Sequence, residues 1–135
     1  MNNSKSVILV VLCVLMLGGC SSVVSCDDGR DARWFSSPTD HVLNNGIKSY
    51  EDGDYAASMT ILQSLLNNQA ASTAEKVRAY KYMAFIHCVS SQDRLCRESF
   101  RKAFELDPNF NLSPAEAGHP VWGPVFSSER NKLSK

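Results

Sequence analysis

The stretch that decides the fold runs from residue 80 to residue 108 and reads YKYMAFIHCVSSQDRLCRESFRKAFELDP. Apolar and small side chains recur every three or four residues in both halves, a spacing that places them on one face of a helix. The polar residues 90–93 separate the halves, and residues 107–108, Asp-Pro, end the second. The pattern predicts a helical hairpin. Its inward side chains are Val77, Tyr80, Ala84 and His87, flanked by Phe85 and Cys88, then Cys96, Phe100, Ala103 and Phe104.

A similar pattern lies upstream of this hairpin. Apolar residues follow a helical period on both sides of Gly53-Asp54, which predicts two antiparallel helices joined by a tight turn. The residues that carry this period are Leu43, Ile47 and Tyr50, then Tyr55, Met59, Leu62 and Leu66.

Two helix starts are marked by capping signals. Ser72 and Glu75 have the spacing of a capping box, and Ser113 and Glu116 repeat it with Pro114 at the first helical position. The second of these helices stops after about one turn at residues 118–120. A last helix follows, and we expect its apolar face to close the exposed end of the second hairpin. That face consists of Val121, Trp122, Val125, Phe126 and Leu133. No segment alternates as a strand would, so the predicted class is all-α.

The two hairpins are similar to each other at a spacing of 38 residues, which pairs Gly46 with Ala84 and Ser58 with Cys96. Such a period with a helix-turn-helix unit is typical of α-solenoids. The second hairpin resembles a tetratricopeptide (TPR) repeat, and the first resembles a divergent copy. The matching residues are Tyr80, Met83, Ala84, His87, Cys96, Phe100, Ala103 and Pro108. The resemblance implies two TPR-like repeats with a C-terminal capping helix; the alternative is two amphipathic hairpins that match a degenerate pattern by chance.

Composition limits the function. The chain has 135 residues, with 14 Lys or Arg and 14 Asp or Glu, a balance that excludes a strongly basic nucleic-acid binder and an acidic disordered tail. Lys5 precedes an unbroken apolar run at residues 7–17, the layout of a secretory signal peptide. At about 1.5 Å per residue the run spans roughly 16 Å, too short for a hydrocarbon core of about 30 Å. A permanent transmembrane helix is therefore the weaker interpretation.

Residues 17–20, Leu-Gly-Gly-Cys, resemble a bacterial lipobox. The resemblance implies that Cys20 receives a diacylglyceryl group and, after cleavage, an N-acyl chain; the alternative is a chance cysteine after an ordinary signal. Ser21 and Ser22 follow where an Asp would imply retention in the inner membrane, so the resemblance implies the outer membrane, facing the periplasm. We expect a signal peptide at residues 1–19, a lipidated flexible tether at 20–39 and the helical domain at 40–135.

Export would place the remaining cysteines in an oxidising compartment. Cys88 falls late in one predicted helix and Cys96 early in the next, across a short turn. We expect a disulfide between them, with two buried thiols as the alternative and Cys26 left unpaired.

The stretch from residue 107 to residue 126, taken with the lipobox and the hairpins, resembles the small TPR lipoproteins associated with type VI secretion gene clusters, the TssQ-like family. The resemblance implies an accessory role at the outer membrane and supplies no catalytic residues. We expect a groove that holds a peptide or helix of an envelope protein. The aromatic candidates for this contact are Tyr50, Tyr55, Tyr80 and Trp122, and the alternative is that they are core residues. The basic candidates are Arg94, Arg97 and Arg101. The alternative for them is a solvated face with ion pairs of Glu98 to Lys102 and Arg101 to Glu105.

No motif indicates catalysis. His41, His87 and His119 are far apart and lack zinc-ligand spacing, and no phosphate loop or nucleophile motif is present. We expect no enzyme activity, no metal, no cofactor beyond the lipid, no nucleic acid and no small-molecule substrate. The competing hypotheses are a pilotin that escorts a secretin or pilus pore subunit and, more remotely, an envelope enzyme such as a peptidoglycan hydrolase.

Overall fold

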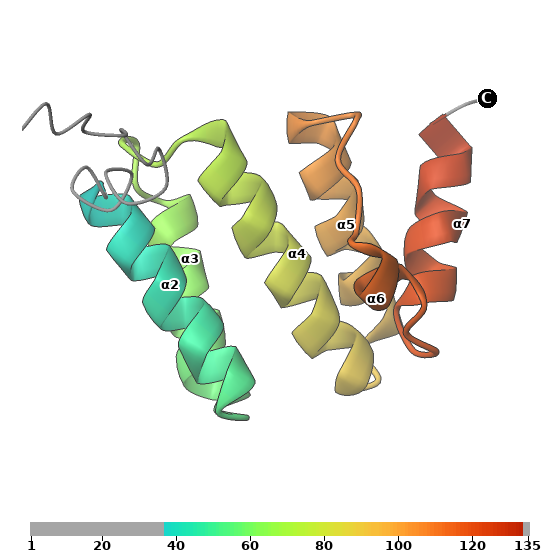
Figure 1. The fold of residues 1–135 in the computed structure, drawn as a ribbon, viewed down its shortest axis with the longest axis horizontal. Helices are drawn as coiled ribbons and strands as arrows, with labels where there is room; N and C mark the ends of the chain where they lie inside the picture. Colours follow the sequence, from blue (N-terminus) through green and yellow to red (C-terminus); the bar gives the residue numbers. More distant parts are fainter. Residues whose placement is uncertain (1–36, 134–135) are drawn as a thin grey trace, which may run out of the picture. The chain divides into compact units, whose positions relative to one another are not determined.

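A computed structural model describes residues 37–133 of the chain (Figure 1). These residues form six helices and no strand, so the all-α prediction is confirmed for this part of the chain. The helices are α2 (Pro38–Glu51), α3 (Tyr55–Leu66), α4 (Thr73–Val89), α5 (Asp93–Leu106), α6 (Pro114–Ala117) and α7 (Gly123–Leu133).

Helix α2 begins earlier than the sequence suggested. The Ser37 side chain accepts a hydrogen bond from the Asp40 amide and Pro38 occupies the first turn, so the helical domain starts before residue 40. Residues 37–39 therefore belong to the helix and its cap and not to the tether. Thr39 is buried.

Helix α4 is the central element, because it packs against α2 and α3 on one side and against α5 on the other. Ala79 and Met83 pack with the core residues of α2 and α3. Ala84, Phe85 and Cys88 pack instead with the core residues of α5 and the C-terminal segment. The spacing predicted that Phe85 and Cys88 flank the buried stripe of this helix. The structure instead places both residues in the core. The capping box predicted at Ser72 and Glu75 is present.

The turn between α2 and α3 and the turn between α4 and α5 are the same turn, repeated 38 residues later. Gly53 has φ +81° and its counterpart Ser91 has φ +58°, both in the left-handed region. The backbone hydrogen bonds also correspond: the Gly53 amide donates to the Tyr50 carbonyl, and the Ser91 amide to the Cys88 carbonyl. The two hairpins thus share their turn geometry as well as their sequence pattern.

Small residues are buried at equivalent positions of both hairpins. A Cβ on Gly46 would lie 2.7 Å from Leu62 Cδ2, so glycine permits the close approach of α2 and α3. Its counterpart Ala84 is fully buried, as are Ser58 and Cys96 at the next pair of equivalent positions.

The C-terminal segment covers the second hairpin. The predicted capping box of Ser113 and Glu116 starts α6, and α7 packs against α5 and α6 (Figure 1). Trp122 and Phe126 are buried as expected, whereas Val121 and Leu133 are exposed. The prediction of a closing helix is confirmed. Its buried face is not purely apolar, because Glu129 is buried there.

The predicted signal peptide at residues 1–19, Cys20, Cys26 and most of the predicted tether lie outside the described residues. Within the described helices, none is long and apolar enough to cross a membrane.

Candidate functional site

A pocket of about 560 Å³ opens on one face of α4, and we call it the α4 pocket. Its floor is the first half of α4, and its wall is the end of α5 with the loop that follows. Val77 and Phe110 make much of it apolar, while Arg78 and Lys81 bring two cations to it. The full lining is Thr73, Ala74, Val77, Arg78, Lys81, Leu106, Asp107, Phe110 and Asn111.

Three tyrosines form a cluster next to this pocket, on α2, α3 and α4. The Tyr50 ring lies 5.8 Å from the Tyr55 ring in a stacked arrangement and 5.2 Å from the Tyr82 ring in an edge contact. Tyr55 is 38% exposed, and Tyr50 and Tyr82 are half-buried. We call these residues the tyrosine cluster.

Lys81 connects the pocket and the cluster. Its Nζ lines the pocket, lies 4.6 Å from the centre of the Tyr82 ring and forms a 2.6 Å ion pair with Glu116 on α6. Burial by itself would raise the pKa of Glu116, but its hydrogen bonds with Lys81 and Ser113 and the charge of Lys81 outweigh burial and lower it. This carboxylate therefore stays charged at neutral pH.

The hydroxyls of Tyr50 and Tyr82 stay protonated in this setting. Burial raises the pKa of Tyr82, and the nearby charge of Glu116 adds to the effect. Burial likewise raises the pKa of Tyr50, with Tyr55 and Tyr82 contributing. Protonated phenols offer a hydrogen-bond donor beside an apolar ring, a combination common at protein interfaces.

The structure brings together only some of the aromatic residues chosen from the sequence. Tyr50 and Tyr55 lie in the tyrosine cluster. Tyr80 instead lines two smaller pockets between α3 and α5, with Lys102 Nζ 5.8 Å from its ring. Trp122 is only 8% exposed and stacks on Phe85 at 4.3 Å, so it belongs to the core.

The three arginines of α5 have different partners. Arg94 lies 3.7 Å from Glu98, and Glu98 also lies 3.7 Å from Lys102, which is a pair that the salt-bridged alternative predicts. Arg97 and Arg101 instead reach Glu129 on α7, at 3.2 and 3.9 Å. Among the described residues no ion pair joins Arg101 to Glu105. Arg97 and Arg101 therefore connect α5 to the capping helix, whereas Arg94 pairs within α5.

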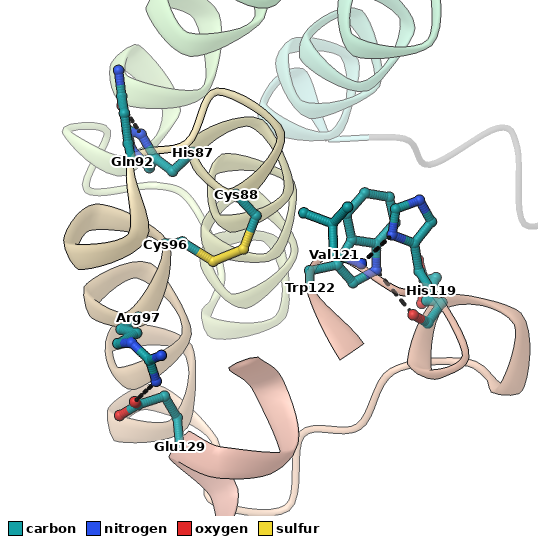
Figure 2. Close-up of a disulfide and its surroundings, with 10 residues drawn as sticks. His87, Cys88, Gln92, Cys96, Arg97, His119, Val121, Trp122 and Glu129 are labelled. Carbon is teal, nitrogen blue, oxygen red and sulfur yellow. Dashed lines mark hydrogen bonds and ion pairs between the residues drawn. A yellow bond between two sulfur atoms is a disulfide. The ribbon is translucent and has the colours of Figure 1, made fainter. Parts of the chain in front are cut away.

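Cys88 and Cys96 lie at disulfide distance, with their Cα atoms 5.1 Å apart, and Figure 2 shows the bond between their sulfur atoms. The expected pairing is thus present in the structure. Both cysteines are buried next to Phe85, Phe100 and Trp122, so the disulfide lies within the core and not at an open site.

Sequence reasoning missed Tyr82, Lys81 and Glu129. Tyr82 had a detectable signal, because apolar residues surround α4 on nearly every side, as expected for a helix with neighbours on two sides. Glu129 also had one: it lies three residues after Phe126, on the apolar stripe of the last helix. A buried carboxylate at such a position requires a cationic partner.

The chemistry offered by this surface is binding. It combines an apolar floor, the Arg78 cation and partly exposed aromatic rings, which suits a helix or peptide with apolar side chains. Within residues 37–133, no group of three His, Cys, Asp or Glu side chains could hold a metal ion.

No family model matches the chain, and neither a curated protein nor a solved structure matches it.

Proposed function

We propose that this protein is an outer-membrane lipoprotein that faces the periplasm and acts as a protein–protein adaptor, accessory to the type VI secretion system. In this proposal Cys20 carries the lipid, the tether provides reach and the helical domain binds an envelope protein. The lipid is the only covalent group required, and the protein catalyses no reaction.

The repeated turn supports the assignment of two TPR-like repeats. Gly53 and Ser91 adopt the same left-handed conformation, and the small residues at equivalent positions are buried in both hairpins. A chance match to a degenerate pattern would not require matching turn hydrogen bonds. The capping helix α7 fits an array of only two repeats, because a terminal repeat needs cover for its apolar face.

The observation that carries the binding function is the α4 pocket with the adjoining tyrosine cluster. Apolar side chains of a partner helix would fill the pocket over Val77 and Phe110. Tyr55 would contribute aromatic area at low entropic cost, and Arg78 would meet a partner carboxylate.

Anchoring is tested with Cys20→Ala in the native cell. The proposal expects loss of lipid labelling and release of the protein from the membrane fraction. Unchanged labelling and continued membrane attachment would refute the lipoprotein assignment.

Partner binding is tested by crosslinking and purification from native membranes, with wild type compared with a Tyr55→Ala/Arg78→Ala variant. A secretion component should co-purify with wild type and be lost from the variant. Thr60→Ala, on the exposed side of α3, is the matched control and should keep the partner. Equal recovery in all three proteins would contradict the proposed surface.

Two other functions are separated by simple observations. A secretin gene next to this gene would favour the pilotin hypothesis, whereas sheath and baseplate genes favour the secretion accessory. If the purified protein hydrolysed peptidoglycan and Tyr55→Ala left this activity unchanged, the result would favour an envelope enzyme.

A further inference from the structure

A buried carboxylate holds three cations at the surface where α5 meets α7. Glu129 is only 2% exposed. Its Oε1 lies 2.7 Å from Lys132 Nζ and 3.2 Å from Arg97 Nη1, and its Oε2 lies 3.9 Å from Arg101 Nε (Figure 2 shows the Arg97 contact). We call Arg97, Arg101 and Lys132 the cation cluster.

The cluster has more positive charge than its carboxylate can balance. Within residues 37–133, three cations form ion pairs with this one anion, so these ion pairs leave a surplus of two positive charges. Burial would raise the pKa of Glu129, but hydrogen bonds from Lys132 and Arg97 and their charges outweigh burial and lower it. Glu129 therefore stays ionised at neutral pH and keeps the cations in place.

Most donors of the cluster face solvent. The side chains of Arg97, Arg101 and Lys132 are 43%, 55% and 61% exposed. A guanidinium has five N–H donors, and Arg97 uses one of them on Glu129, while Arg101 approaches at ion-pair distance without a hydrogen bond. The remaining donors can bind an incoming anion, because Glu129 holds the three cations in place.

The cluster extends along the helix. Arg94 precedes Arg97 on α5; it lies 3.7 Å from Glu98, and its side chain is 83% exposed. From Arg94 to Arg101 the helix rises about 10 Å at roughly 1.5 Å per residue, more than a single phosphate or carboxylate covers. A row of cations of this length matches a row of carboxylates on a polypeptide.

We propose that the cation cluster is a second binding surface, which takes an acidic segment of a partner protein. It shares no residue with the α4 pocket and goes beyond the function proposed above. Bidentate contacts from Arg97 and Arg101 to successive Asp or Glu side chains neutralise the surplus charge, and Lys132 adds a third contact. The protein then has two separate contact surfaces, as an adaptor requires.

The test uses the full-length protein purified in detergent and a fluorescein-labelled Glu-Ala repeat peptide, with fluorescence anisotropy as readout. The expected result is binding that weakens as salt rises and is at least tenfold stronger than that of the Gln-Ala peptide. Arg97→Gln/Arg101→Gln should weaken it at least tenfold. The charge-matched control Lys48→Gln/Lys76→Gln should change it less than twofold.

A second measurement keeps the test valid if the Gln variant fails to fold. In the wild-type protein, the Glu-Ala peptide should protect Lys132 from acetylation and leave Lys48 unprotected. Arg97→Lys/Arg101→Lys, which keeps the charges, should bind within about threefold of wild type.

Several outcomes would overturn the proposal. These are equal binding of the Glu and Gln peptides, an equal loss in the Lys48→Gln/Lys76→Gln control, and displacement by inorganic phosphate beyond that of chloride at equal ionic strength, which would indicate a small-anion site. Preferential binding to anionic phospholipid vesicles over the peptide would assign the surface to a membrane instead.

Discussion

The two hairpins have the same turn but are fastened differently. In the α2–α3 hairpin, the Ser58 hydroxyl donates a 2.8 Å buried hydrogen bond to the Gly46 carbonyl. At the position equivalent to Ser58, the α4–α5 hairpin has Cys96, which is bonded to Cys88. The second hairpin also packs against α7 and is joined to α6 by the Lys81–Glu116 ion pair, whereas the only described helix that packs against α2 and α3 from outside their hairpin is α4.

The difference separates stability from binding. The covalently fastened, covered hairpin contains the larger aromatic core, and the hairpin held by hydrogen bonds contributes Tyr50 and Tyr55 to the exposed surface. Changes to the second hairpin should therefore alter stability strongly, and exposed changes in the first should alter it little.

The largest effect is expected from Trp122→Ala. The indole stacks on Phe85 and donates a 2.9 Å hydrogen bond to the Glu116 carbonyl, so its removal leaves a cavity between the cap and α4. We expect a loss of about 3 to 4 kcal/mol in the free energy of unfolding, measured by urea denaturation. Tyr55→Ala is the control and should cost less than about 1 kcal/mol. Equal losses would remove the distinction between the hairpins.

Loss of the disulfide should have the next largest effect. Cys88 and Cys96 are separated by eight positions, and closing so short a loop stabilises the fold by about 2 to 3 kcal/mol. Cys88→Ala/Cys96→Ala should lower stability by that amount, and a reducing agent should do the same to wild type only. If the reductant also destabilised the double variant, another cause would be at work.

The contact between the starts of α2 and α4 should give a pH-dependent effect. Burial would raise the pKa of Glu75, but hydrogen bonds from Ser72, then Thr39 and Ser37, outweigh burial and lower it from 4.5 to about 2. Because the folded pKa is below the unfolded value, the stabilisation is complete above pH 4.5 and is lost as pH falls toward 2.

Glu75→Gln should therefore cost roughly 1 kcal/mol at neutral pH, the size of a helix-capping contribution, with the gap closing in acid. Stability curves of wild type and variant against pH measure this. Glu51→Gln, on the exposed end of α2, is the control and should give no such convergence. A constant gap down to pH 2 would rule out the assigned ionisation.

The smallest effects concern the shared turn and should have opposite signs. A Cβ on Gly53 meets no atom within 4 Å, so Gly53→Ala should cost about 1 kcal/mol through the backbone alone. Ser91 already adopts the left-handed conformation that disfavours a side chain, so Ser91→Gly should raise the free energy of unfolding by about 0.5 kcal/mol. Thermal unfolding measures both, and changes of the same sign would show that the turns are not equivalent.

The sequence predicted the helices and their caps because these depend on local signals. Helical spacing indicated the hairpins, and Ser72 with Glu75 marked the start of α4. The position of Glu129 under Arg97 and Arg101 depends on how α7 crosses α5, which local spacing does not encode. Tyr80 and Tyr82, two residues apart on α4, lie on different faces as helical spacing requires, but which face meets the tyrosines of α2 and α3 depends on how the helices pack.

The most direct test of the adaptor account is site-specific photocrosslinking in the native cell. A photoreactive residue at Arg78 or Tyr55 should yield the same discrete crosslinked protein, because Arg78 lines the α4 pocket and Tyr55 belongs to the tyrosine cluster, and Lys81 connects the two. The exposed positions Thr60 and Asn68 should not yield it, and Cys20→Ala should abolish it. The same product at all four positions, or none at Arg78 and Tyr55, would contradict the account.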